Sequence, residues 1–264
     1  MTALRDFDLE ATLECGQCFR WDRQPDGSYR GTAGGKALCV SQDHMEAAMD
    51  DPFWRAYFDL DRDYAAIREA LSASDPVLAK AASFAPGIRI LQQDPWEALC
   101  SFIISQNNNI PRIKGIISRL CEAFGEEMEQ GVRCFPSPER LAGLEEEDLA
   151  CLRCGFRARY ILDAARKVAS GEVDLKALRT APLAQAREQL MAIVGVGPKV
   201  ADCALLYGLH RLEAFPMDVW MKRAMKEWFP GRKPEDFGPY AGIAQQYLFH
   251  YIRTAPPGGQ SVSA

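Results

Sequence analysis

The sequence predicts an α+β protein that is mostly α-helical, with a small antiparallel sheet near its N-terminus. This prediction depends on three observations. Apolar and polar residues alternate between turn signals in the first forty residues, which is typical of short strands. From about Met45 onward, apolar residues recur at three- and four-residue spacing, which indicates helices. Two of those helices are joined by a glycine hairpin, Gly195-Val196-Gly197, in a helix–hairpin–helix motif.

The expected elements follow in order along the chain. The first forty residues are expected to form strands and turns, with tight turns at Pro25-Asp26-Gly27 and Gly34-Gly35. Helices follow in DPFWRAYFDLDRDYAAIREALSAS, and beyond Asp94 the chain is expected to be almost continuously helical. Helix starts are predicted at three Pro-containing pairs: Asp94-Pro95, Ser137-Pro138 and Ala181-Pro182. We therefore predict an N-terminal antiparallel β/α domain at 1–92, a helical domain at 93–252 and a disordered tail at 253–264.

The composition favours a protein of a reducing compartment. The 264 residues are 48% hydrophobic, which is enough for one large core or two modest ones. No run approaches the ~18 apolar residues of a membrane span, and MTALRDFDLEATLE lacks the apolar stretch of a signal peptide. The nine cysteines are an odd number without repeated spacing, which predicts reduced thiols. We therefore expect a cytoplasmic location at the bacterial nucleoid, or a nuclear one in a eukaryote.

The distribution of charge is more informative than the net charge of −5, which does not suggest a nucleic-acid binder. Residues 151–170 contain five basic side chains against one acidic, and residues 218–233 contain five against two. Either segment alone is explained by a solvated helix face. Because the two segments flank the glycine hairpin, together they favour a phosphate-binding surface.

The hairpin is expected to lead into a helix from about Pro198 to Tyr207, with Gly208 as its stop. Backbone N–H groups at such a helix start suit phosphate oxygens, although an ordinary helical turn has the same pattern. Lys199 lies in the first turn, where the helix dipole disfavours its protonated form. A neutral amine is the nucleophile that makes Schiff bases. The sequence therefore predicts Lys199 as a candidate nucleophile.

Two further residues accompany this lysine. Cys203 is four residues on and shares the helix face, although a small core residue is the simpler interpretation. Asp218 precedes an apolar and basic helix, so it is expected to cap that helix. Alternatively, its carboxylate faces Lys199, where it accepts a proton or stabilises positive charge on a sugar. The two interpretations of Asp218 are compatible.

Several motifs in order resemble those of 8-oxoguanine DNA glycosylase, a lysine-bearing branch of the helix–hairpin–helix glycosylase superfamily. They are GQCFRW, SFIISQNNNIPRIKGIISRLCEAFG, GFRARYI, GVGPKVADCALLYGL, PMDVWMKRAM and GPYAGIAQQYLF, and they extend from Cys15 to Phe249. The resemblance implies a small antiparallel domain packed on a helical domain, with double-stranded DNA bent across the hairpin. It also implies that a damaged guanine is flipped out of the duplex.

The resemblance also assigns roles to residues on the lesion strand. Lys199 is similar to the nucleophile that attacks the sugar C1′, expels the base and leaves an imine that permits β-elimination. Asp218 matches its partner carboxylate. The base pocket implied by the resemblance comprises Gln245 on the Watson–Crick edge, Phe249 and Cys203 on the two faces, and the Gly16 carbonyl at N7–H. The hairpin residues Gly195, Val196 and Gly197 match a phosphate-binding segment. The alternatives are a core Phe249 and a surface Gln245.

On the opposite strand, Asn107, Arg112 and Arg157 match residues that contact the unpaired cytosine, and Phe156 matches an aromatic wedge. Arg157 as a solvated charge is the alternative. Trp220 stands where many eukaryotic members of the family have a histidine near phosphate, so this contact is expected to be weaker or differently made. Phe156 stands where eukaryotic members have tyrosine. Opposite-base reading therefore depends on side chains from several separate motifs.

The sequence predicts no metal site. Cys203 is the last cysteine, which removes the iron–sulfur cluster of related superfamily members. Cys151-x2-Cys154 lacks a second ligand pair and is interpreted as structural. No cofactor is predicted, except that the hairpin carbonyls could hold a monovalent cation. The expected partner is double-stranded DNA containing 8-oxoguanine. The protein is expected to act as a monomer and not to bind a membrane. The rival hypotheses are an alkylation-repair glycosylase that acts through water and a non-catalytic DNA-binding module.

Overall fold

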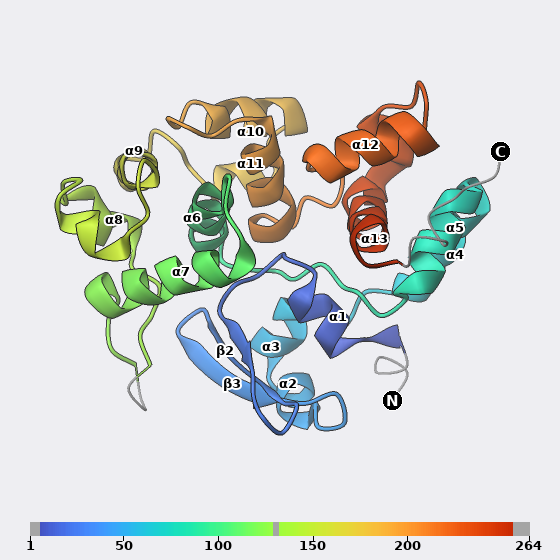
Figure 1. Ribbon diagram of the computed structural model, residues 1–264, viewed down its shortest axis with the longest axis horizontal. Coiled ribbons are helices and arrows are strands. Elements are labelled where there is room, and N and C mark those ends of the chain that lie inside the picture. Colours follow the sequence, from blue (N-terminus) through green and yellow to red (C-terminus); the bar gives the residue numbers. More distant parts are fainter. Residues whose placement is uncertain (1–5, 129–131, 256–264) are drawn as a thin grey trace.

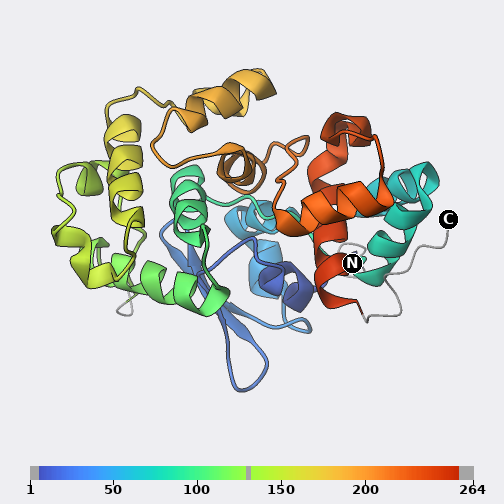
Figure 2. The same ribbon diagram turned by 45° about the horizontal axis from the view of Figure 1, so that its top comes forward.

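The computed structural model describes residues 6–128 and 132–255. A small antiparallel sheet lies at the bottom of Figure 1 and the helices lie above and beside it, as the turned view in Figure 2 also shows. The predicted fold class, a small antiparallel sheet packed on a mostly helical body, is confirmed. None of the helices in the described ranges is long and apolar enough to cross a bilayer.

The sheet has three strands in the order β1-β2-β3, comprising Trp21–Arg23, Tyr29–Ala33 and Lys36–Val40. Both strand pairs are antiparallel, as predicted from the alternating pattern. The prediction of strands and turns throughout the first forty residues was wrong at Leu9–Glu14, which forms helix α1. The Asp8 carboxylate caps α1 by accepting from the Ala11 N–H at 2.8 Å. Burial of Leu9 and Leu13, four residues apart, gives this short helix its apolar face.

An aromatic cluster forms the core beneath the sheet. Trp21 of β1 packs against Trp54, Tyr57 and Phe58, and its indole N–H donates to the Tyr57 hydroxyl at 2.8 Å. The backbone of Gly31 in β2 approaches this indole so closely that a Cβ there would lie 2.2 Å from a ring atom. A glycine is therefore required for the strand to cover the tryptophan.

The remaining elements are helical. In the N-terminal half they are α2 (Glu46–Asp50), α3 (Pro52–Tyr57), α4 (Tyr64–Ser74), α5 (Pro76–Phe84), α6 (Pro95–Ser105) and α7 (Ile110–Phe124). Then follow α8 (Pro138–Ala142), η3 (Asp148–Leu152), α9 (Arg157–Ala169), η4 (Ala177–Arg179) and α10 (Leu183–Met191). The last are α11 (Pro198–Cys203), η5 (Ala204–Gly208), α12 (Val219–Trp228), η6 (Pro234–Tyr240) and α13 (Ala241–Thr254).

The predicted helix starts are found at the prolines of α6 and α8, where Asp94 and Ser137 cap the N-termini. The third start differs slightly, because Pro182 itself occupies the cap position and α10 begins at Leu183. α13 continues to Thr254, so the predicted tail begins inside a helix that buries Tyr251 and Ile252. Residues 256–264 of that predicted tail lie outside the described residues.

The helix after the hairpin differs from the single α-helix that was predicted. α11 ends at Cys203, and the chain continues through one π-helical turn, η5, to Gly208. Gly208 lies against α6, because a Cβ at this position would be 2.8 Å from the Ala98 Cβ. The π-helical turn and this close contact with α6 thus occur in the same segment.

Two buried clusters divide the core. The smaller one lies under the sheet and is made by the N-terminal segment up to Leu60 together with Leu91. The larger one includes α4 and α5 as well as the later helices, and α13 packs against both α5 and α12. Helices near both ends of the chain therefore share one core, which fixes the position of α13 relative to α6 and α11. The predicted domain division at residue 92 stays a prediction.

Candidate functional site

The glycine hairpin is supported by α9. Gly195 has φ +80°, and a Cβ there would lie 2.4 Å from the ring of Tyr160. The Val194 N–H donates to Asp163 Oδ2 at 2.7 Å, and Lys167 Nζ donates to the Ala192 carbonyl at 2.5 Å. The hairpin is therefore held by the Tyr160 ring and by the ion pair of Lys167 and Asp163.

The backbone donors of the hairpin are not equivalent. The Val196 N–H already donates to the Ile193 carbonyl at 3.0 Å, and the Val196 side chain is buried. Within the described chain, the N–H groups of Gly195 and Gly197 have no hydrogen-bond partner. If the hairpin holds a phosphate, the two glycines rather than Val196 can supply the donors.

Lys199 is half-buried and lies on α11 directly after the hairpin. Its Nζ lies 5.2 Å from the ring centroid of Phe102 in α6. That ring stacks on Tyr207 at 5.2 Å and meets Phe19 edge-on at 5.9 Å. No carboxylate in the described ranges forms an ion pair with Lys199. An aromatic platform therefore supports an amine that no acidic side chain neutralises.

Cys203 is buried, and burial raises the pKa of its thiol to about 11, against a lowering by nearby Lys199 and a raising by Asp202 and Asp218. The thiol is therefore neutral at physiological pH and suits contact with an apolar surface rather than nucleophilic attack. Lys199 and Cys203 lie four residues apart on α11, as predicted.

Asp218 caps α12, as one of its two interpretations predicted. Its Oδ1 accepts from the Met221 N–H at 2.8 Å. No partner is recorded for Oδ2 among the residues that the structure describes. One carboxylate oxygen thus fixes the side chain while the other is available, so the electrostatic role stays a prediction that is compatible with the cap.

Gln245 and Phe249 share a face of α13, as their spacing predicted. Gln245 is not a surface amide, because only 3% of it is exposed. Its Oε1 is buried and has no hydrogen-bond partner among the described residues. The adjacent Gln246 accepts from the Tyr207 hydroxyl at 2.6 Å, although its Nε2 is also unpaired. Buried polar atoms are almost always paired, so an unpaired one requires an explanation. A ligand that donates a hydrogen bond to Gln245 Oε1 would satisfy this buried oxygen.

Gly16 lies in a tightly fixed loop and has φ +87°. The buried amide of its neighbour Gln17 donates to the carbonyls of Thr12 and Arg89 at 2.9 and 2.7 Å and accepts from the Leu91 N–H at 2.9 Å. This network leaves little freedom to the Gly16 backbone. Sequence reasoning did not single out Gln17, because its partners are up to 74 residues away.

A cavity of about 390 Å³ joins this loop to α13. Cys15, Phe249 and Arg253 are among its lining residues. A Cβ at Gly16 would lie 3.9 Å from Arg253 Nη1, and the Arg253 guanidinium lies 5.0 Å from the Phe249 ring centroid. Phe249 and Arg253 therefore line a cavity next to the Gly16 loop. Arg253 was missed, although its four-residue spacing from Phe249 could have indicated it.

The residues predicted to read the opposite base lie together at the N-terminus of α9. Arg157 is 2% exposed, and its guanidinium donates to the carbonyls of Gln106, Asn107 and Cys154. Burial, followed by the charge of Arg112, lowers its pKa. It is therefore not a solvated charge, and backbone carbonyls use most of its donors.

Arg112, Asn107 and Phe156 are exposed beside this buried arginine. Arg112 makes one long hydrogen bond, at 3.5 Å, to the Arg153 carbonyl. Asn107 has φ +48°, a strained angle that the Arg157 bond to its carbonyl helps to hold. Phe156 is 48% exposed, as a wedge residue would be.

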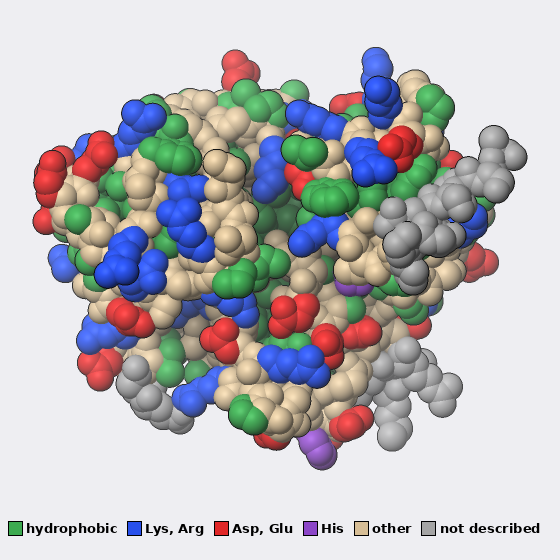
Figure 3. All heavy atoms as spheres, viewed as in Figure 1, with side chains coloured by type: hydrophobic (Ala, Val, Ile, Leu, Met, Phe, Trp, Pro, Cys, Tyr) green, Lys and Arg blue, Asp and Glu red, His purple; other side chains and the backbone are tan. Residues whose placement is uncertain are grey.

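The surrounding surface is basic and partly apolar. In Figure 3, Lys and Arg side chains gather over α9 and α12 on both sides of a central hollow. Trp220, next to Asp218, is 44% exposed, and Val194 on the hairpin is 50% exposed. Positive side chains combined with exposed apolar ones are typical of surfaces that bind nucleic acid.

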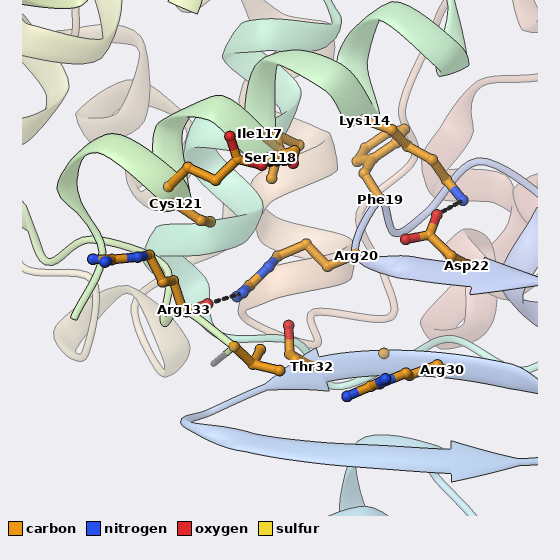
Figure 4. A pocket seen from close by; sticks show the side chains of 13 residues that line it. Phe19, Arg20, Asp22, Arg30, Thr32, Lys114, Ile117, Ser118, Cys121 and Arg133 are labelled. Carbon is orange, nitrogen blue, oxygen red and sulfur yellow. Dashed lines mark hydrogen bonds and ion pairs between the residues drawn. The ribbon is translucent and has the colours of Figure 1, made fainter. Parts of the chain in front are cut away.

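A second cavity, of about 350 Å³, lies between the sheet and α7 (Figure 4). Two of its cations, Lys114 and Arg20, are already paired. Lys114 contacts Asp22 at 3.2 Å, and Arg20 contacts Glu97 at 3.2 Å and donates to the Arg133 carbonyl at 2.5 Å. This cavity is separate from the residues around Lys199.

Metal chemistry has no evident basis in the described residues. No group of three or more His, Cys, Asp or Glu side chains there could hold a metal ion. All nine cysteines are free thiols, with Cys151 exposed and Cys154 buried.

Comparisons with known proteins identify the family. Residues 2–99 match the N-terminal domain of 8-oxoguanine DNA glycosylase, and residues 100–236 match the HhH-GPD superfamily of base excision DNA repair proteins. The N-glycosylase/DNA lyase OGG1 of Arabidopsis thaliana is 32% identical over 92% of this chain and 77% of its own length. The chain belongs to the 8-oxoguanine DNA glycosylase family. The resemblance inferred from the motifs is thus confirmed.

Solved structures of this family share the fold of the chain. A structure of MBOgg1 in complex with a low-affinity DNA ligand is 46% identical, with a TM-score of 0.84 over 94% of this chain and 92% of that one. The Clostridium acetobutylicum 8-oxoguanine glycosylase/lyase, in complex with DNA containing cytosine opposite 8-oxoguanine, is 37% identical with a TM-score of 0.83 and the same coverage. In two other curated relatives, the chain spans 64% and 44% of the relative's length.

Proposed function

We propose that this protein excises 8-oxoguanine opposite cytosine from double-stranded DNA and then nicks the strand, as a DNA glycosylase and AP lyase. The observation that carries the proposal is the position of Lys199, which lies directly after the hairpin, over the Phe102 ring, and forms no ion pair with a described carboxylate. Such an amine, together with the Asp218 carboxylate, suits attack on a sugar carbon that develops positive charge. Family membership supplies the substrate class.

In the proposed reaction, the Lys199 Nζ lone pair bonds to C1′ as the bond from C1′ to the base breaks. The bonding electrons leave with the base, which takes up a proton. Asp218 Oδ2 would supply the negative charge that stabilises the cationic sugar. Loss of a proton from Nζ and opening of the sugar ring give an imine. Removal of a C2′ proton then expels the 3′ phosphate, which nicks the strand.

The flipped base would be held between the Phe249 ring and the neutral Cys203 thiol. Gln245 Oε1 would accept from N1–H or the exocyclic amine of the guanine edge, which would end its isolation. The Gly16 carbonyl would accept from N7–H, a donor that guanine lacks. A positive φ at Gly16 favours glycine for this approach.

On the other strand, we propose that Arg112 and Asn107 contact the unpaired cytosine and that Phe156 fills the gap left by the flipped base. Arg157 would hold the two loops that present these side chains, because its donors are engaged with their carbonyls. The glycines of the hairpin would bind a backbone phosphate. We also propose action as a monomer in the cytoplasm, and a monovalent cation at the hairpin carbonyls.

The test is a nicking assay on duplexes that contain 8-oxoguanine, uracil or an alkylated purine opposite cytosine. The proposal predicts that the strand is cleaved at 8-oxoguanine alone, without alkali treatment. It also predicts that Lys199→Gln abolishes this cleavage. Excision of alkylated purines that leaves the strand intact would instead indicate an alkylation-repair glycosylase. Binding without any cleavage would indicate a non-catalytic module.

A further inference from the structure

Arg253 lies at the junction of the Gly16 loop and Phe249 and forms no ion pair with another described residue. Its guanidinium contacts the Phe249 ring at 5.0 Å between centres. Three carboxylates line the same cavity, those of Asp8, Glu10 and Glu14, yet none of them forms an ion pair with it in the described ranges. A cation–π contact at an exposed site is weak, so the side chain can turn toward a ligand at small cost.

The position of this guanidinium relative to Gly16 is specific. Arg253 Nη1 is the nearest group that a Cβ on Gly16 would meet, at 3.9 Å. Gly16 is fixed by the Gln17 network, and Arg253 projects from the last turn of α13, four residues after Phe249. Two rigid elements thus place five N–H donors beside the loop that would contact the N7 edge of the base.

We propose that Arg253 is a specificity-determining residue that donates a hydrogen bond to O8 of the lesion. This inference rests on the proposed function, in which Gly16 accepts from N7–H. In 8-oxoguanine, O8 is the atom beside that N–H, and it is an acceptor. Guanine has a C–H at this place and offers the guanidinium nothing to bind. Gly16 and Arg253 would therefore recognise the two adjacent atoms that oxidation changes.

The charge of Arg253 strengthens this role. Hydrogen bonds from a charged donor are stronger than those between neutral groups, and their loss corresponds to roughly a ten- to hundred-fold change in rate. A neutral thiol and an aromatic ring on the two faces of the base cannot distinguish the oxidised from the normal base by hydrogen bonding. The edge contacts must do so.

The experiment measures single-turnover excision of 8-oxoguanine opposite cytosine and, in parallel, nicking of the same duplex with a preformed abasic site. Arg253→Ala is expected to slow excision by roughly ten- to a hundred-fold and to leave abasic nicking within about two-fold. Arg253→Lys should lose less, because it keeps one charged donor. Thr254→Ala is the matched control, since Thr254 lines the same cavity but donates to the His250 carbonyl at 2.7 Å. It should retain the wild-type rate.

A second readout does not depend on turnover. In a Lys199→Gln background, the ratio of affinities for 8-oxoguanine and guanine duplexes should fall by roughly ten-fold when Arg253→Ala is added. Unchanged excision and an unchanged ratio would overturn the role of Arg253 alone. Equal losses on the lesion and the abasic duplex would assign Arg253 to a phosphate and also overturn it. A wild-type protein that nicks abasic DNA but never excises 8-oxoguanine would contradict the proposed function itself.

Discussion

The lesion side and the opposite-strand side of this molecule differ in how their polar groups are satisfied. On the lesion side, three polar groups lack partners among the described residues: the Lys199 amine forms no ion pair, one Asp218 oxygen is unpaired, and Gln245 Oε1 is buried without a donor. At the N-terminus of α9, by contrast, the guanidinium of Arg157 is surrounded by three backbone carbonyls. The first region has open partners that a ligand would supply, whereas the donors of Arg157 are already used in the free protein.

This difference distinguishes residues expected to take part in the reaction from residues that hold the binding loops in place. An unpaired buried polar atom lowers stability, and a bound ligand can supply the missing partner. A buried arginine that joins two loops instead stabilises the free protein and pre-organises the exposed Arg112 and Asn107. Substitutions on the lesion side should therefore reduce activity with little loss of stability, and substitution of Arg157 should do the reverse. The predictions below test this contrast, from the largest expected effect to the smallest.

The largest effect is expected for Asp218→Asn. Loss of the negative charge should reduce excision by about 100- to 1000-fold, because preorganised electrostatic contributions are typically worth ~3–4 kcal/mol. Stability should change little, since asparagine also caps helices. Single-turnover rates and urea unfolding check both expectations. Asp94→Asn is the matched control, because Asp94 caps α6 in the same way, at 2.9 Å from the Glu97 N–H. Equal losses of activity in the two variants would reduce Asp218 to a cap.

The two arginines of the opposite-strand side should behave differently. Arg112→Ala should relax the preference for cytosine by roughly ten- to a hundred-fold, because one base contact contributes ~1–3 kcal/mol of discrimination. Arg157→Ala should instead destabilise the protein by on the order of 3 kcal/mol, since it leaves several carbonyls unpaired. Excision opposite each of the four bases, together with urea unfolding, checks both. A stable Arg157→Ala variant that loses the preference would mean that Arg157 reads the base directly.

Replacement of Gln245 by methionine should separate function from stability. Gln245→Met removes the unpaired buried oxygen with little change of volume, so the free energy of unfolding should stay equal or rise. Excision should fall by about ten-fold, while binding to an abasic analogue stays intact. Gln246→Met is the control, because its Oε1 accepts from Tyr207 and its replacement should destabilise the core. A Gln245→Met protein that is less stable and fully active would contradict the contrast.

The smallest effect concerns pH and the support of the lesion side. Burial raises the pKa of Glu97 from its ordinary 4.5 to about 7, despite the nearby charge of Arg20. Because the folded state binds this proton more tightly than the unfolded state, its stabilising contribution is complete below pH 4.5 and is lost as the pH rises through about 7. Unfolding of the wild type and Glu97→Gln between pH 4.5 and 8 should show this decline only in the wild type. The same dependence of unfolding free energy on pH in both proteins would contradict this role of Glu97.

The sequence predicted much of the fold because its signals are local. Proline after a capping side chain marked the starts of α6 and α8, and alternating residues marked the strands. The same local reasoning placed Gln245 and Phe249 on one helix face and Asp218 at a cap. It failed at α1, where six residues with an Asp8 cap are too short for periodicity to show.

Long-range packing decided what the sequence did not predict. The π-turn in η5 occurs where Gly208 contacts α6, and burial of Arg157 depends on carbonyls about 50 residues away. The proximity of Gly16 to Arg253 joins residues at opposite ends of the chain. Isolated motifs carry no information about such contacts. For the same reason, the sequence could not show that Gln245 Oε1 is buried without a partner.

The central claim is that the unpaired Lys199 amine is the nucleophile, and borohydride trapping tests it most directly. Reduction of a reaction with 8-oxoguanine DNA should convert the imine to a stable covalent adduct of protein and DNA, seen as a band of reduced mobility in a denaturing gel. Lys199→Gln should form no adduct while it still binds the lesion duplex, since the phosphate contacts come from other residues. Adduct formation at wild-type yield in Lys199→Gln would contradict the account.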